Sequence, residues 1–305
     1  MNGNLADRLR DAIRNHILTE LSTDSGGELE AKTLGELLIA YGNWRARFVP
    51  QRPRTVHRSN ELDANSKSSE HEEALGTITA AIEIGDNITP YLSERVMTAY
   101  QSTASRSAKL QKRQDLDLLI ADWGIHHFHL STVLQSNGFV QRTSDLLFAA
   151  FMPGDAYFID IRPHDSWTDV DLLSCVVHNW PAAGIVHQLA GLGLAAPIGA
   201  DQRRKLRNAG IAGIIEIDGK VFAPAGQTTA GTPIRVTLHA NQVMNVLNWL
   251  DRTLTDNPHW FDQELRAAGV DASEQDDWQP VISDGVFGFL EQVRHIHYPI
   301  GSLIL

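Results

Sequence analysis

The clearest structural signal in the chain is the stretch Asp145-Leu-Leu-Phe-Ala-Ala-Phe-Met-Pro-Gly-Asp-Ala-Tyr-Phe-Ile-Asp-Ile-Arg162. Two apolar and aromatic segments flank a short interruption in which Pro153 is followed by Gly154, a pair that suits a tight turn. We therefore predict a β-hairpin at this position. Because side chains two apart in a strand share a face, we expect Asp160 and Arg162 to point the same way.

A second hairpin is predicted at residues 213–222, where Asp218-Gly219 is the preferred dipeptide for a two-residue turn. Helices are expected around the hairpins, because apolar residues recur there at helical spacing. They cover residues 5–21, 33–44, 74–84, 170–178, 183–192, 241–253 and 285–293, and a further one begins at Thr89. The predicted fold class is α+β, with a helical N-terminal region followed by a mixed region of two antiparallel β-hairpins packed by helices.

The segment 59–73 is rich in Ser, Asn, Asp, Lys and Glu, a composition typical of an exposed loop or linker. It supplies the predicted domain boundary. We expect an N-terminal helical region at 1–58, the loop or linker at 59–73, a central α+β domain at 74–185 that holds the first hairpin, and a C-terminal α+β region at 186–305 that holds the second.

The 305 residues carry a formal net charge of -11. This balance argues against indiscriminate binding to nucleic acid, because such binding depends on Lys and Arg neutralising phosphates. No stretch approaches the roughly 18 uninterrupted apolar residues of a membrane span, and the first residues lack a secretory signal pattern. We expect a cytoplasmic protein without membrane contact. Cys175 lies in an apolar run and is expected to be a buried thiol, and without a dinucleotide fingerprint we expect no cofactor.

Basic residues are nevertheless concentrated in two short segments that contain no acid. The segment 44–58 holds five arginines, and the segment 101–114 adds a second basic group. Such islands favour a local basic groove that could bind RNA. The candidate nucleic-acid-binding residues are Arg45, Arg47, Arg52, Arg54, Arg58, Lys109, Lys112 and Arg113.

Candidate chemistry is concentrated in Asp122-Trp-Gly-Ile-His-His-Phe-His129 and at the end of the first hairpin. In an extended segment, His127 and His129 share one face while His126 lies on the other. Arg142 precedes the first strand of the hairpin, and Arg162 and His164 stand at the end of the second.

These residues supply what metal-free RNA cleavage needs: a base for the ribose 2′-hydroxyl, an acid for the leaving oxygen, and guanidinium groups for the phosphorane charge. The predicted catalytic set is His127, His129, His164, Arg142 and Arg162, with no metal ligand.

An Arg before a strand, a tight turn, an aromatic and aliphatic return strand and a closing Arg-x-His resemble the central hairpin of ribonuclease toxins of the RelE and YoeB type. The resemblance covers residues 122–167. It implies that Arg142 and Arg162 contact phosphate or the transition state, that His164 is an acid-base group, and that an antitoxin is a possible partner. Those toxins are small and strongly basic, whereas this chain is long and acidic and has no lysine between Arg113 and Lys205. A mechanism that depends on lysine could not operate here.

Three alternatives remain open from the sequence. The His-x-His spacing recurs at His295 and His297, so converging imidazoles could hold zinc in a metal-dependent hydrolase. The pairs His57-Arg-Ser59 and His129-Leu-Ser131 are similar to the paired motifs of two-histidine phosphoesterases. The third is a non-enzymatic interaction or scaffold protein whose acidic surface docks a partner. The leading prediction is a metal-independent RNA-cleaving or RNA-binding effector of a bacterial toxin or phage-defence system, with RNA and an antitoxin or defence component as partners.

Overall fold

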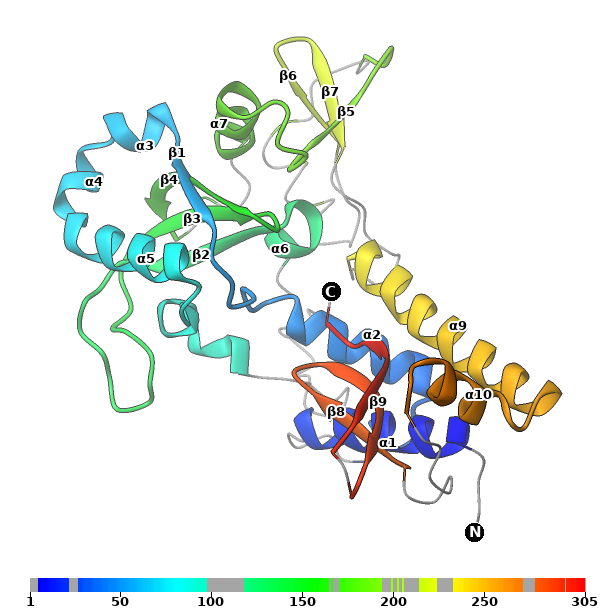
Figure 1. The fold of residues 1–305 in the computed structure, drawn as a ribbon. Helices are drawn as coiled ribbons and strands as arrows, with labels where there is room; N and C mark the ends of the chain where they lie inside the picture. Colours follow the sequence, from blue (N-terminus) through cyan, green and yellow to red (C-terminus); the bar gives the residue numbers. More distant parts are fainter. Residues whose placement is uncertain are drawn as a thin grey trace. The chain divides into compact units, whose positions relative to one another are not determined.

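The computed structural model describes residues 5–21, 27–97, 118–164, 166, 170–193, 199, 202, 205, 214–223, 233–270, 278–293 and 295–304. These residues form helices and three small sheets, so the predicted α+β class is confirmed (Figure 1). The chain forms two compact units. The first comprises described residues of 1–45 and 235–305, and the second those of 46–98 and 108–234, so this division differs from the four segments expected from the sequence. Lys109, Lys112 and Arg113 lie outside the described residues.

The second unit is built on a four-stranded sheet in the order β1-β4-β3-β2. The first predicted hairpin is confirmed as β3 (Asp145–Phe151) and β4 (Asp155–Pro163), which pair antiparallel. β2 (Ile125–His129) extends the sheet antiparallel to β3, and β1 (Thr55–Arg58) pairs parallel with β4 on the other side.

A β-bulge interrupts the hairpin. Phe148 pairs with Asp160 and its neighbour Ala149 pairs with Phe158, so Ile159 has no partner on β3. An extra residue of this kind lets two consecutive side chains lie on one face of the sheet. Ile159 therefore remains in the core while Asp160 is turned to the same side.

Helices lie on both faces of this sheet (Figure 1) and pack against it through apolar side chains. On one face, Phe148 and Ile159 pack with Val176 of α7 (Val170–Asn179). On the other, Phe128 and Phe158 pack with residues of α5 (Glu72–Ile84). Buried apolar residues on both faces explain why the strands are nearly continuous hydrophobic runs rather than alternating ones.

The segment expected as a loop or linker instead forms two short helices, α3 (Asn60–Ala64) and α4 (Ser66–Glu70). Its polar residues are helix caps. The Ser59 hydroxyl accepts a hydrogen bond from the Leu62 N–H at 2.9 Å, and the Asn65 side chain accepts one from the Lys67 N–H at 3.1 Å. Because Leu62 is fully buried, this segment is part of the core. A composition typical of loops is also typical of capping residues, so it could not separate the two.

Gly85 ends α5 in the left-handed region, with φ +79°. A Cβ at this position would lie 2.6 Å from the backbone nitrogen of Pro53. We expect Gly85→Ala to reduce the free energy of unfolding by at least about 1–2 kcal/mol, the cost of left-handed backbone for a residue with a Cβ. Urea denaturation measures the change. Gly76→Ala, in the open middle of α5, is the matched control and should stabilise by about 0.5–1 kcal/mol; equal effects of the two substitutions would contradict the prediction.

The second predicted hairpin is also confirmed, as β6 (Ile215–Ile217) and β7 (Lys220–Ala223). Its turn residues Asp218 and Gly219 both have positive φ, as a two-residue turn of this type requires. The helix expected at 183–192 is wrong, because β5 (His187–Leu189) pairs there with β7. Glycines with positive φ stand on both sides of that strand, at 184 and 191, and such backbone does not continue a helix.

Among the described residues between α5 and β2 there are three short helical segments. The helix predicted from Thr89 is two 3-10 turns, η1 (Thr89–Tyr91) and η2 (Glu94–Met97). The third segment, α6 (Leu118–Trp123), leads directly into β2.

The first unit contains α1 (Leu5–Glu20), α2 (Leu34–Arg45), α9 (Ile234–Asp256) and α10 (Trp260–Ala267). Helices predicted at 5–21, 33–44 and 241–253 are thus confirmed, the last within the longer α9. None of the helices among the described residues combines the length and the apolar character needed to cross a bilayer.

The helix expected at 285–293 is wrong. β8 (Trp278–Ser283) and β9 (Val286–Glu291) form a third hairpin, and β10 (His297–Ser302) completes its sheet. Asp284 and Gly285 make the turn, both with positive φ. This is the same dipeptide that identified the second hairpin, so the signal was present in the sequence.

Candidate functional site

The three histidines of the stretch 122–129 lie on β2, and their side chains alternate between the two faces of the sheet as predicted. The His126 ring lies 5.5 Å from the Phe151 ring on one face of the sheet. The His127 ring lies 6.3 Å from the Phe148 ring on the other. By the same alternation, His129 shares the face of His127.

The strand register arranges the predicted residues in two rows across β2, β3 and β4. One row joins His127, Phe148 and Asp160, and the next joins His129, Leu146 and Arg162. Asp160 and Arg162 therefore share a face, as predicted, and it is the face that carries His127 and His129. The bulge at Ile159 makes this possible, because without it Asp160 would pair with Leu147 on the opposite face.

Four of the five residues predicted to be catalytic come together on this face of the sheet, near the end of β4. His164 directly follows β4, and its ring centroid lies 6.3 Å from that of His127. The charge of Arg142 is close enough to lower the pKa of both His129 and His164. The structure thus gathers His127, His129, His164 and Arg142 from β2, the end of β4 and the segment before β3.

His129 is the most buried member of the group, with 1% of its surface exposed. Its Nδ1 accepts a hydrogen bond from the Thr143 backbone N–H at 3.1 Å, so the neutral ring carries its proton on Nε2. Burial, and then the positive charge of Arg142, lower its pKa to about 4. Nε2 is buried and has no hydrogen-bond partner among the described residues. His129 therefore presents a neutral N–H donor at pH 7.

The rings of His127 and His164 lie side by side, so the charge of one acts on the other. Burial lowers the pKa of His164 below the ordinary 6.5, and the charge of His127 lowers it further. Two imidazolium groups at this spacing repel each other, so a proton on one ring favours the neutral form of the other. A neutral and a protonated imidazole side by side are the two groups that acid-base chemistry requires.

A concavity of about 330 Å³ opens at His129. It lies between η2 and the loop that joins β2 to β3, which is the long green loop in Figure 1. The loop is a small hairpin closed by the pairing of Leu134 with Val140, and the Val140 N–H donates to the Pro90 carbonyl at 2.9 Å. The lining residues are Leu92, Glu94, His129, Gln135, Phe139, Val140, Gln141 and Arg142.

The sequence did not single out Glu94, Gln135, Phe139 or Gln141, nor Arg95, whose charge contributes to lowering the pKa of His164. The one available signal was a polar stretch, 135–138, between a histidine strand and Arg142. Polar loops carried by a rigid sheet are where binding groups concentrate.

Arg162, the fifth predicted residue, is directed to Asp160. Its Nε donates to the buried Asp160 carboxylate, which also accepts from the Asn65 side chain at 2.8 Å and from the Ile161 N–H at 2.8 Å. This network fixes the end of β4 immediately before His164. We therefore infer that Arg162 positions His164, and its contact with phosphate stays a prediction.

Two of the arginines predicted to bind nucleic acid are internal, which corrects that prediction. Arg47 and Arg54 are 6% and 5% exposed. Arg47 donates to the Arg95 carbonyl at 3.2 Å, and Arg54 donates to the Met152 carbonyl at 3.0 Å. These guanidinium groups hold η2 and the β3–β4 turn, so they are not available to phosphate. A count of charges along a sequence cannot detect an arginine that binds backbone carbonyls.

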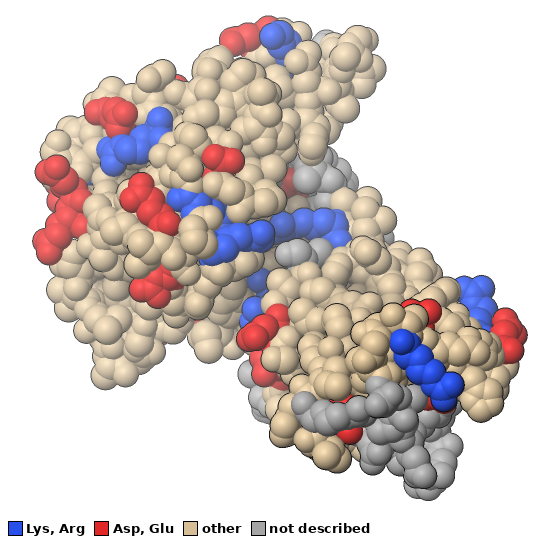
Figure 2. All heavy atoms as spheres, viewed as in Figure 1, with Lys and Arg blue, Asp and Glu red and all other residues tan. Residues whose placement is uncertain are grey.

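The other arginines of that segment are partly accessible. Arg58 forms an ion pair with Asp63 at 2.6 Å, Arg45 lies over the Trp44 ring at 5.8 Å, and Arg52 is exposed. Figure 2 shows basic and acidic side chains interspersed among the described residues of the face in view, with several acidic ones over the α3–α5 region. The face in view therefore has no broad basic surface among its described residues.

The two-histidine phosphoesterase arrangement is not formed. His57 lies on β1 and His129 on β2, the two edges of the sheet, three strand spacings or about 14 Å apart at least. His57 instead pairs with Asp155 at 2.7 Å and stacks on Tyr157 at 5.0 Å.

The described residues contain no group of three or more His, Cys, Asp or Glu side chains that could hold a metal ion. Cys175 is buried, as predicted. Burial raises its pKa to about 12, and its Sγ donates to the Glu61 carboxylate at 3.2 Å. A thiol in this state is a poor nucleophile.

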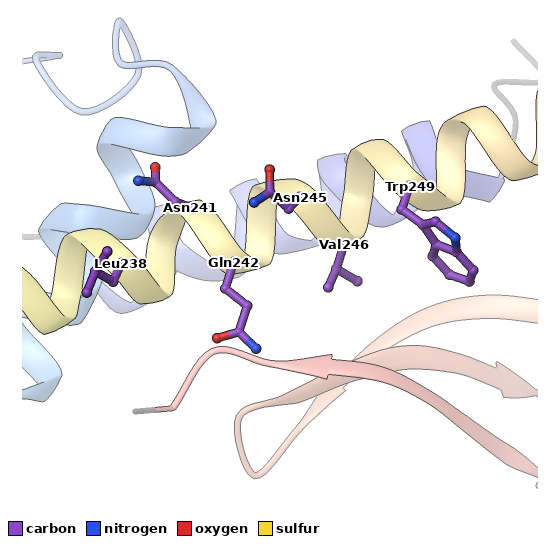
Figure 3. Close-up of a pocket in the computed structure, with 6 residues that line it drawn as sticks. All are labelled: Leu238, Asn241, Gln242, Asn245, Val246 and Trp249. Atoms are coloured by element: carbon purple, nitrogen blue, oxygen red, sulfur yellow. The ribbon is translucent and has the colours of Figure 1, made fainter.

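A second concavity runs along α9 in the first unit (Figure 3). Figure 3 shows Leu238, Gln242, Val246 and Trp249 spaced along the helix, with Asn241 and Asn245 beside them. None of these six lining side chains titrates, so this groove cannot supply acid-base chemistry. The concavity at His129 is the better candidate site.

Comparison with protein-family models, curated proteins and solved structures found no match to this chain. The resemblance of residues 122–167 to ribonuclease toxins stays a prediction.

Proposed function

We propose that this chain is a metal-independent RNA-cleaving effector, of the toxin or phage-defence type, acting at His127, His129, His164 and Arg142. The observation that carries the proposal is the His127–His164 pair, with ring centroids 6.3 Å apart, beside the buried N–H donor of His129. RNA needs no external nucleophile, because its own 2′-hydroxyl attacks the adjacent phosphate.

In the proposed reaction, neutral His164 takes the proton of the 2′-hydroxyl, and the 2′-oxygen forms a bond to phosphorus. The bond from phosphorus to the 5′-oxygen breaks, and protonated His127 gives its proton to that oxygen. The products are a 2′,3′-cyclic phosphate and a 5′-hydroxyl. Exchange with water then returns the proton to His127.

Arg142 and His129 have separate electrostatic roles in this scheme. The Arg142 guanidinium offsets the negative charge of the phosphorane, and the buried His129 ring stays uncharged beside it. The lowered pKa of His129 keeps it neutral, so its N–H does not compete with His127 for the role of acid. We place the reaction in the cytoplasm, where an antitoxin or defence component would control it.

The test is to incubate the purified chain with an RNA oligonucleotide of mixed sequence in the presence of a chelator. We expect cleavage to persist and to leave 2′,3′-cyclic phosphate and 5′-hydroxyl ends. A substrate with one 2′-deoxy nucleotide at the main cleavage position should resist cutting there while remaining sensitive elsewhere. Absence of cleavage under all metal conditions would contradict the proposal and favour the interaction-protein alternative. Products with 5′-phosphate ends would contradict the mechanism.

A further inference from the structure

We propose that the concavity beside His129 is a nucleobase subsite that selects guanine. The inference rests on the proposed RNA cleavage, because it names the nucleotide whose 3′-phosphate that reaction would cut. Its evidence is separate and consists of the side chains that line the concavity away from the His127–His164 pair.

The dimensions and walls fit a planar ring. At about 330 Å³ the space lies at the lower end of ligand pockets, which span about 300–1,000 Å³. Leu92, Phe139 and Val140 supply apolar and aromatic surface for the faces of a base. Phe139 and the buried Leu92 and Val140 belong to or pack against the core, which fixes this surface. Stacking on such walls tolerates any base, so selection must come from the polar groups.

Two charged side chains line the concavity, and of these Glu94 is the acceptor while Arg142 is a donor. Glu94 is the first residue of η2, and its Oε2 accepts a hydrogen bond from the Asn137 side chain at 3.1 Å. Asn137 also accepts from the Phe139 N–H at 3.0 Å, so the same residue shapes the loop tip and orients the carboxylate. An ionised carboxylate offers two oxygens and no donor.

Among the four RNA bases, guanine alone presents two adjacent donors on its Watson–Crick edge, N1–H and the N2 amino group. Both can pair with the two oxygens of one carboxylate. Adenine and cytosine set a ring-nitrogen acceptor beside their amino group, and uracil sets carbonyl acceptors on both sides of its single N–H, so each would face Glu94 with a repelling lone pair. The side-chain amides of Gln135 and Gln141 can donate to the guanine O6 carbonyl.

The proposed base subsite adjoins the proposed catalytic residues. His129 lines the concavity and lies beside Arg142. A guanosine with its base in the concavity and its 3′-phosphate on Arg142 would present the adjoining 2′-hydroxyl to the His127–His164 pair.

The experiment measures binding of the four nucleoside 3′-monophosphates to the full chain by isothermal titration calorimetry. We expect guanosine 3′-monophosphate to bind at least about tenfold more tightly than the other three, the discrimination of one good bidentate contact. Glu94→Gln replaces one carboxylate oxygen by a donor and should remove this preference. Glu83→Gln, at an exposed position on α5 outside the concavity, is the matched control and should keep it.

The outcomes separate this inference from the proposed function. Equal binding of all four nucleotides together with RNA cleavage would overturn the guanine subsite and leave the cleavage intact. Selective binding of the guanosine nucleotide without cleavage of any RNA would support the subsite and overturn the proposed reaction. Guanine preference that survives Glu94→Gln would also overturn the assignment, and no binding by any nucleotide would overturn it outright.

Discussion

Replacing His164 with alanine is expected to slow RNA cleavage by about a thousandfold, within the range of about 10²–10⁴ that one acid-base group contributes. The half-buried side chain stands at the end of β4, so its removal should cost little stability. Initial rates under saturating RNA measure the effect on kcat. Added imidazole should restore part of the lost rate, because a free base can enter the space that the side chain leaves.

The pH profile distinguishes chemistry from structure in the same variant. His164 acts as a base only when neutral, so the wild-type rate should fall as the pH drops through its pKa, which burial and the charges of His127 and Arg142 hold below 6.5. His164→Ala should lose this acid limb. His57→Ala, on the opposite edge strand, is the control and should cleave normally. If His57→Ala lost activity while His164→Ala kept it, the assignment of the site would be wrong.

Acidification from pH 7 to 4 is expected to lower the free energy of unfolding of the second unit by about 3 kcal/mol through His129 alone. The folded chain holds the pKa of this histidine at about 4, and the unfolded chain returns it to the ordinary 6.5. Between these values the unfolded state binds more protons, so the free energy of unfolding falls as the pH falls from 6.5. Below pH 4 both states are protonated and the loss is complete.

The comparison with His129→Gln isolates this contribution. Glutamine does not titrate and keeps an acceptor for the Thr143 N–H, whereas alanine would leave a cavity and destabilise the fold at every pH. The measurement is the hydrogen-exchange protection of β3 amides, which pair with β2. The wild type should lose about 3 kcal/mol relative to the variant between pH 7 and 4. Equal losses of unfolding free energy in the wild type and in His129→Gln would refute the role of His129. His178→Gln, at an exposed histidine, is the control and should behave as wild type.

The sequence was sufficient where the signal is local. Side-chain alternation in a strand depends only on neighbouring residues, so the shared face of His127 and His129 followed from their spacing. The relation of Asp160 to Arg162 was predicted for the same reason, since both lie after the bulge. Turn chemistry was equally reliable at Asp218-Gly219. Asp284-Gly285 carries the same turn signal, but the helical spacing of apolar residues at 285–293 competes with it, so the local pattern there predicts the wrong element.

The rest depends on contacts between distant segments. Glu94 reaches the concavity because η2 packs against a loop some forty residues later, joined through Asn137, and nothing in the local pattern of either segment specifies this. Arg47 and Arg54 could not be distinguished from surface arginines, because their partners are backbone carbonyls that have no sequence signature. The polar residues at 59–73 were ambiguous in the same way, since caps and loops use the same side chains.

The bulge at Ile159 makes the geometry of this site depend on chain length as much as on side-chain identity. One residue gained or lost between Asp160 and His164 would turn the following side chains to the face that α5 covers, however well the residues themselves were kept. In relatives of this chain, substitutions near the end of β4 should therefore be common compared with insertions and deletions. An unbroken spacing from the bulge to His164, together with His164 itself, would be the mark by which a descendant of this site could be recognised in an alignment.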